Sequence, residues 1–107
     1  MKLYWAKHVW AALFLLPLAA QADITPARQQ QLLYLLRQDC GSCHGMTLQG
    51  GLGPALTPQA LSGKSSDMLR TVILYGRPGT PMPPWQPFMS ESEAAWLVQQ
   101  LLEGKAL

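Results

Sequence analysis

Two cysteines and a histidine stand close together near the middle of the chain, at Cys40, Cys43 and His44. Thiols three positions apart can add to the two vinyl groups on one edge of a porphyrin. A histidine that follows them directly can then bind the iron from one face. We interpret Cys-Gly-Ser-Cys-His as an attachment site for haem c, with Cys40 and Cys43 forming thioethers and His44 as the proximal iron ligand.

The same cysteines could instead form half of a zinc site or a redox-active pair. A structural zinc site needs four ligands, but the sequence has no third cysteine. Its other histidine, His8, lies in a segment that we expect to be removed. A thioredoxin-like pair needs a βαβ context, and the sequence sustains no strand-like alternation. Haem attachment is therefore the preferred interpretation.

Residues 1–22 have the three parts of a secretory signal peptide. A positively charged start with Lys2 and Lys7 precedes an apolar run at 9–20, and Ala-Gln-Ala at 20–22 is a small-x-small cleavage site. An uncleaved membrane anchor is the alternative, but a spanning helix needs about 20 apolar residues. We expect cleavage after residue 22, which leaves 23–107 as one domain in an extracytoplasmic space, most simply the periplasm.

Cleavage would also change the net charge. The full chain is formally +2, but six basic and six acidic side chains remain in 23–107, so the mature domain is formally neutral. These side chains are Arg28, Arg37, Lys64, Arg70, Arg77 and Lys105, against Asp23, Asp39, Asp67, Glu91, Glu93 and Glu103. Haem propionates would add negative charge. No basic patch indicates binding to nucleic acid or to an anionic membrane.

Two helices are expected before residue 76. The first begins at Pro26 behind the N-cap Thr25 and ends at the haem motif. The second runs from about 66 to 75, with Gly76 as its stop. A loop rich in glycine, at 50–54, lies between them, and glycines allow the backbone to approach a flat ligand closely.

The last helix is expected to begin after the N-cap Ser90, because Glu93 stands three residues later as in a capping box. Apolar residues repeat at helical spacing over 94–101, and Gly104 ends the helix. This periodicity places Trp96 off the centre of the apolar stripe, where it would be partly exposed.

Five prolines in residues 77–87 exclude a regular helix and predict a stiff, extended path. Met82 lies among them, and a thioether held in this way is a suitable soft ligand for haem iron.

Three other methionines of residues 23–107 are weaker candidates for the distal ligand. Met46 is two residues from His44 and cannot reach the opposite face of the porphyrin. Met68 lies in a predicted helix, where filling the core is the expected role. Met89 lies just before the last helix. We therefore predict Met82 as the distal iron ligand.

Together these motifs resemble a class I cytochrome c over essentially all of residues 23–107. The resemblance implies an all-α fold of three to four short helices around one covalently attached haem, with the first and last helices crossing. It also implies that the Pro54 carbonyl accepts a hydrogen bond from the second ring nitrogen of His44. Trp96 and Leu97 would pack on the first helix, so on Trp96 we follow the resemblance rather than the periodicity.

More narrowly, two segments resemble the small periplasmic cytochromes that accompany cd1-type nitrite reductase in denitrifying bacteria. They are Arg-Gln-Asp-Cys-Gly-Ser-Cys-His-Gly and Gly-Arg-Pro-Gly-Thr-Pro-Met-Pro-Pro-Trp. The resemblance implies a monomeric one-electron carrier between an upstream donor and nitrite reductase, not an enzyme. His44 would be the only histidine left after cleavage, so no second imidazole would serve acid–base chemistry.

The alternative is an accessory redox or tetrapyrrole-binding factor in maturation of the d1 haem of that reductase. A second ligand would need an apolar patch beyond the haem crevice, for which Tyr75, Trp85 and Phe88 are the available aromatic residues.

Overall fold

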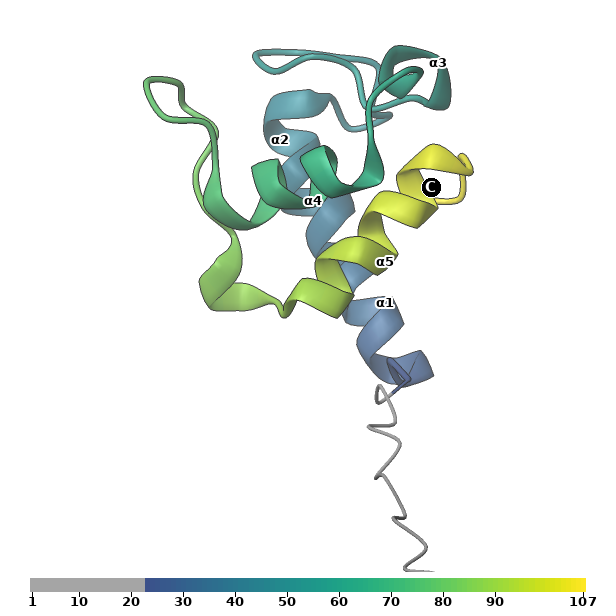
Figure 1. Cartoon of the computed structure of the whole chain (residues 1–107). Coiled ribbons are helices and arrows are strands. Elements are labelled where there is room, and N and C mark those ends of the chain that lie inside the picture. Colours follow the sequence, from purple (N-terminus) through teal and green to yellow (C-terminus); the bar gives the residue numbers. More distant parts are fainter. Residues whose placement is uncertain (1–22) are drawn as a thin grey trace, which may run out of the picture.

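The computed structural model describes residues 23–107, which form helices joined by long loops (Figure 1). The elements are α1 (Pro26–Leu35), η1 (Leu36–Cys40), α2 (Gly41–His44), α3 (Pro58–Leu61), α4 (Ser66–Tyr75), η2 (Gln86–Phe88) and α5 (Glu91–Leu102). Within these described residues there is no β-strand, so the expected all-α class is confirmed. The proposed signal peptide, residues 1–22, lies outside them.

The first helix begins as expected and continues through the haem motif. The Arg28 amide donates a hydrogen bond to the Thr25 side chain, which satisfies one free N–H of the first turn. Helical backbone then passes without a break through η1 and α2 to His44. The helix thus ends at the haem motif as expected, but it includes the whole motif and ends at His44. Gly41 has helical dihedral angles, and the break comes at Gly45, whose φ is +92°.

The segment η1 is one π-helical turn inside this long helix. The Gly41 amide donates to the carbonyl of Leu36, five residues back rather than four. The Ser42 hydroxyl donates to the Asp39 carbonyl at 2.7 Å. The turn ends at Cys40, the first residue of the haem motif, and π turns inside α-helices often occur at functional sites.

Helix α4 has the expected bounds. Ser65 caps its first turn by accepting from the Met68 amide at 3.1 Å. The helix ends at Gly76, whose amide donates to the Val72 carbonyl.

Helix α5 also begins as expected. Ser90 accepts a hydrogen bond from the Glu93 amide at 3.2 Å, which is half of a capping box. The Glu93 side chain pairs with Arg28 of α1. The helix ends at Leu102, and Gly104, with φ +69°, turns the chain back.

The core is built where α5 contacts both α1 and α4. Figure 1 shows α5 crossing in front of α1. The buried cluster consists of Leu32, Leu36, Leu48, Leu61, Leu74, Met89, Ala94, Leu97, Leu101 and Ala106. Trp96 is half-buried, as the periodicity predicted, and it packs against this cluster, which includes Leu32 and Leu36 of the long first helix. Within residues 23–107, no helix is long and apolar enough to span a bilayer.

Candidate functional site

His44 closes α2, and its ring orientation is fixed by a single hydrogen bond. Its Nδ1 atom lies 2.6 Å from the carbonyl oxygen of Pro54. Because a carbonyl oxygen can only accept, Nδ1 must carry the proton, which leaves Nε2 of the neutral ring with a free lone pair. A histidine held in this way is prepared to bind a metal through Nε2.

The glycine-rich loop is tied to the end of α2 through its backbone. The amides of Gly50 and Gly53 donate to the carbonyls of His44 and Cys43, both at 2.7 Å. These bonds satisfy two of the carbonyls that the end of a helix leaves without partners. The loop that carries Pro54 therefore keeps a fixed position against the histidine.

Gly53 approaches the imidazole ring closely. A Cβ atom built on Gly53 would lie 2.9 Å from both Cε1 and Nδ1 of His44, which is closer than real Cβ contacts. Glycine is therefore required here because of the space that the ring occupies. From the sequence we expected the backbone of this loop to approach a flat ligand closely. In the structure, the atoms nearest to a Cβ on Gly53 are those of the His44 ring.

The two cysteines differ in exposure. Cys43 is exposed, whereas Cys40 is half-buried and packs against the apolar cluster. Burial raises the pKa of the Cys40 thiol to about 11, and the negative charge of Asp39 adds to the effect. As free thiols, the pair would present one half-buried group and one solvent-facing group.

Met82 lies on a loop whose ends are joined by backbone hydrogen bonds. The Arg77 amide donates to the Met82 carbonyl at 3.2 Å, and the Trp85 amide donates to the Ile73 carbonyl of α4 at 3.0 Å. The Met82 side chain is half-buried. The expected stiffness therefore comes from this closure as well as from the prolines.

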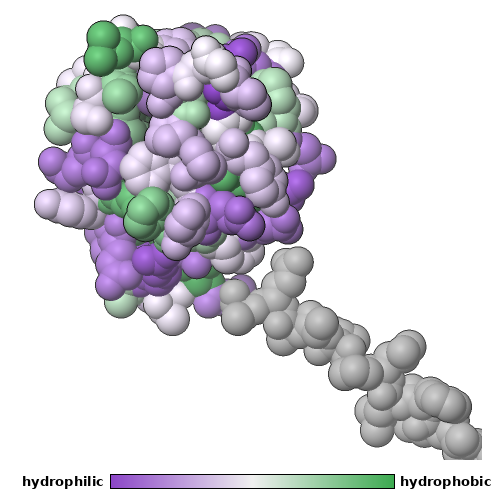
Figure 2. Space-filling view, turned by 90° about the vertical axis from the view of Figure 1, so that its left-hand side faces the viewer, coloured by the Kyte–Doolittle hydropathy of each residue, from purple (hydrophilic) through white to green (hydrophobic). Residues whose placement is uncertain are grey.

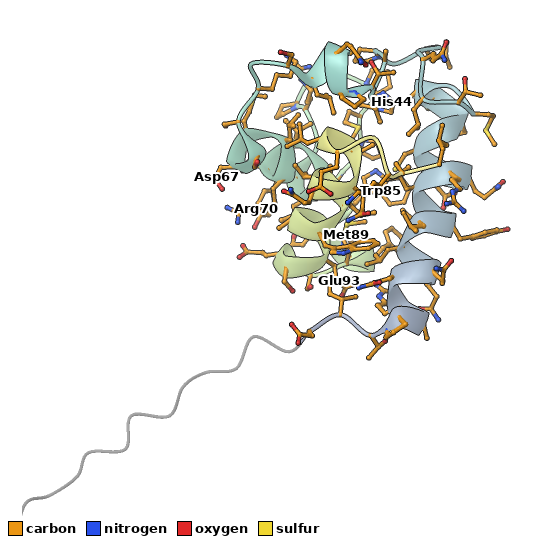
Figure 3. All side chains as sticks on the ribbon, turned by 90° about the vertical axis from the view of Figure 1, so that its right-hand side faces the viewer. His44, Asp67, Arg70, Trp85, Met89 and Glu93 are labelled. Atoms are coloured by element: carbon orange, nitrogen blue, oxygen red, sulfur yellow. The ribbon has the colours of Figure 1, made fainter. Side chains whose placement is uncertain are left out.

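The other methionines have different surroundings. Met89 is 6% exposed and belongs to the buried cluster. Met68, expected in the core, is 42% exposed, and Met46 is 56% exposed. The expectation for Met68 is wrong because its place in α4 faces solvent, whereas Leu74 is the buried residue of that helix. In Figure 3, Met89 lies among the packed helices, between His44 and Glu93 at opposite ends of the molecule.

The three aromatic residues considered for a second ligand differ in exposure. Tyr75 and Phe88 are 51% and 59% exposed, but Trp85 is half-buried against the core. The rings of Trp85 and Phe88 contact each other, with centroids 5.6 Å apart. Figure 2 shows the face that lies on the left in Figure 1, where the loop at 76–85 projects. On this face the hydrophobic residues form separate spots among hydrophilic ones.

Comparison with known proteins identifies the family. Residues 27–100 match the family described as cytochrome c oxidase, cbb3-type, subunit III. The chain is also 56% identical to the cytochrome c55X of Pseudomonas aeruginosa, over 94% of this chain and 89% of the relative. The chain belongs to the cytochrome c55X family. Cytochrome c55X proteins are c-type cytochromes, so the cofactor is haem c, whose iron carries single electrons.

Two solved structures are also similar to this chain. A structure described as c-type cytochrome NirC is 57% identical, with a TM-score of 0.75 over 77% of this chain and 96% of that one. A structure described as dihydro-haem d1 dehydrogenase NirN in complex with DHE is 40% identical, with a TM-score of 0.60. That match covers 64% of this chain but only 15% of NirN.

The residues present fit haem c. A histidine whose Nε2 is free, two cysteines at the required spacing and a half-buried thioether on a closed loop are the donors that this group takes. The cysteines and His44 lie at the end of the long helix, and Met82 lies on the loop at 76–85.

Proposed function

We propose that residues 23–107 bind one haem c covalently through Cys40 and Cys43, with His44 and Met82 as axial ligands, and act as a one-electron carrier. The observation that carries the proposal is the hydrogen bond from His44 Nδ1 to the Pro54 carbonyl, at 2.6 Å. It leaves Nε2 as the ligand atom and raises its basicity.

Each part of the chain has a separate task in this proposal. When bound, the haem iron supplies the electron-transfer step by changing its charge by one. Pro54 holds the imidazole of His44, and the Met82 loop presents a thioether, which gives a higher reduction potential than a second histidine would. The buried cluster that contains Leu32 and Leu36, against which Cys40 packs, would help to keep water from the site.

The proposal assigns no enzymatic activity. His44 is the only histidine in residues 23–107, and its ring is already engaged with Pro54. Met82, if bound to the iron, would occupy the position that a substrate would need.

Replacement of the methionines tests the ligand assignment. In the oxidised haem-loaded protein, Met82→Ala should abolish the weak absorption band at the red edge that reports a Met–iron bond. Met46→Ala and Met68→Ala are controls, since both side chains are exposed, and should keep the band. The assignment to Met82 fails if its replacement keeps the band and Met89→Ala loses it.

The proposed location is the periplasm, after removal of residues 1–22 as a signal peptide. Intact mass measurement of protein from a periplasmic extract should give a chain that starts at Asp23 with one covalent haem. A membrane-retained product that still contains Trp5 and Trp10 would support an uncleaved anchor instead.

We propose cd1-type nitrite reductase as the electron acceptor, by the likeness of the two haem-site segments to the cytochromes that accompany this enzyme. The test mixes the reduced protein with fully assembled reductase and follows oxidation of the haem by stopped flow. Fast oxidation with turnover of nitrite supports the role of carrier. Absence of transfer contradicts it.

A second candidate is an accessory redox or tetrapyrrole-binding role in maturation of the reductase's d1 haem. It is favoured by the likeness of this chain to a part of NirN, which is described as a dihydro-haem d1 dehydrogenase. A strain without the gene separates the two candidates. A reductase that lacks d1 haem in this strain supports maturation, whereas a fully loaded reductase that receives electrons slowly supports the carrier.

A further inference from the structure

The loop that carries Met82 leaves α4 at Gly76 and returns to α4 at Trp85. We propose that Gly76 is a positioning residue for the Met82 thioether, because only glycine lets the Met82 backbone lie against the end of α4. This inference rests on the proposed role of Met82 as the distal ligand. It assigns to Gly76 a task beyond ending the helix, which is all that the sequence indicated.

The backbone at Gly76 is crowded by the loop. A Cβ atom at this position would lie 2.6 Å from the Met82 carbonyl oxygen and 3.0 Å from backbone atoms of Pro83 and Pro84. Backbone atoms next to prolines cannot move aside as the end of a flexible side chain can. A side chain at Gly76 would therefore push the whole segment 82–84 away from α4.

The dihedral angles of Gly76 also exclude other residues. Its φ is +72° and its ψ is −170°, a region that essentially only glycine occupies. The amide of the next residue, Arg77, donates to the Met82 carbonyl at 3.2 Å. The conformation of Gly76 thus aims the following N–H at the residue that carries the thioether.

Inside the loop, Thr80 holds the chain in place. Its amide and hydroxyl both donate to the Arg77 carbonyl, at 3.1 and 2.6 Å. The Thr80 hydroxyl oxygen in turn accepts from the Met82 amide at 3.4 Å. Both the N–H and the C=O of Met82 are therefore held by residues of its own loop. The position of the Met82 thioether therefore depends on the backbone at Gly76 and Arg77, where the loop closes.

Gly79 provides a matched control within the same loop. Its φ is +76°, similar to that of Gly76, but a Cβ atom there would meet nothing within 4 Å. With Pro78 before it and a hydrogen bond from the Thr80 amide to the Arg77 carbonyl, Gly79 has the features of the third residue of a type II turn. Alanine would disturb a left-handed φ at both glycines, but would meet the Met82 carbonyl only at Gly76.

The experiment compares Gly76→Ala, Gly79→Ala and Met82→Ala in the oxidised, haem-loaded protein. It measures the red-edge Met–iron band and the affinity for imidazole, an added ligand that must displace Met82. Gly76→Ala should weaken the band and bind imidazole at least about tenfold more tightly, which corresponds to about 1.4 kcal/mol. Gly79→Ala should keep the band and an affinity within about twofold of the unmodified protein, since its Cβ atom touches nothing.

Two outcomes separate failure of the inference from failure of the proposed function. If Met82→Ala keeps the band, Met82 is not the ligand and both proposals fail. If Met82→Ala loses the band but Gly76→Ala matches Gly79→Ala, the ligand assignment stands and the positioning role of Gly76 is wrong.

A second variant covers the case in which Gly76→Ala does not fold with haem. Thr80→Val keeps the shape of the side chain and removes the hydroxyl that links Arg77 to Met82. It should bind imidazole more tightly than the unmodified protein while its far-ultraviolet circular dichroism is unchanged. An unchanged affinity would overturn the proposal that closure of the loop positions the thioether.

Discussion

Arg28 of α1 and Glu93 of α5 form an ion pair between residues that are 65 positions apart in the chain. The same guanidinium donates to the Phe88 carbonyl at 2.9 Å, just before α5 begins. Side-chain exposure is 35% for Arg28 and 18% for Glu93, so the pair is partly shielded from water. It connects the first and last helices at the end of the molecule away from His44.

Removal of this pair should lower the free energy of unfolding. We expect about 1–2 kcal/mol for Arg28→Ala, since a charge-assisted hydrogen bond and a bond to a backbone carbonyl are lost together. Chemical denaturation of the haem-loaded protein measures the change. Arg70→Ala is the control, because Arg70 pairs with an exposed Asp67 at 3.4 Å and should cost less than about 0.5 kcal/mol. Equal effects of the two variants would contradict the structural role of Arg28.

Gly53→Ala should disturb the proximal histidine. The added Cβ atom meets the His44 ring at 2.9 Å, and overpacking of this kind costs about 1–3 kcal/mol. As the ring turns, the bond to Pro54 weakens, the imidazole becomes less basic and the reduction potential should rise. Redox titration checks this. Gly63→Ala, with φ +80° and nothing within 4 Å, should leave the potential unchanged; a rise in both variants would rule out the steric explanation.

Met89→Ala should cost stability without changing the axial ligand. Met89 is 6% exposed in the core, and truncation of such a side chain costs about 2–5 kcal/mol. Met68→Ala, at 42% exposure, should cost less than about 1 kcal/mol. Thermal unfolding followed together with the red-edge band measures both properties. Loss of the band in a folded Met89→Ala protein would show that the two methionines have been assigned wrongly.

Electron transfer to the proposed partner should depend weakly on salt. The side chains of residues 23–107 include six basic and six acidic groups, so apart from the haem propionates the net charge is formally zero and gives little long-range steering. Over a tenfold range of ionic strength, the second-order rate constant should change by less than about threefold. Stopped-flow measurements at several salt concentrations test this. A steep fall in rate with salt would show that a local charged patch guides docking.

Local signals in the sequence were sufficient for several features of the fold and the site. Ser90 caps α5 and Gly76 ends α4, because capping and helix termination depend on residues a few positions apart. The contact between His44 and Pro54 followed from the family resemblance and is present. Met82 stays a prediction as the distal ligand, supported by the burial of Met89 in the core.

Contacts between distant segments did not appear in the sequence patterns. Arg28 gives no sign that it meets Glu93, and Gly76 gives no sign that it meets the Met82 carbonyl. Both contacts depend on how the chain returns to itself, which periodicity does not describe. Met68 was misplaced because the expectation rested on its residue type, whereas Leu69, Ile73 and Leu74 are the residues of α4 that pack in the core or against it.

The π-helical turn at Leu36–Cys40 makes the geometry of the site depend on the number of residues in this segment. Successive residues of an α-helix are rotated by about 100°, so the extra residue in this turn rotates Cys43 and His44 by about that angle relative to Leu32. Deletion of one residue here would bring the helix back to regular α geometry and turn the cysteines and the histidine to another side. Gln38 is exposed, so replacement of its side chain should disturb the site less than deletion of the residue.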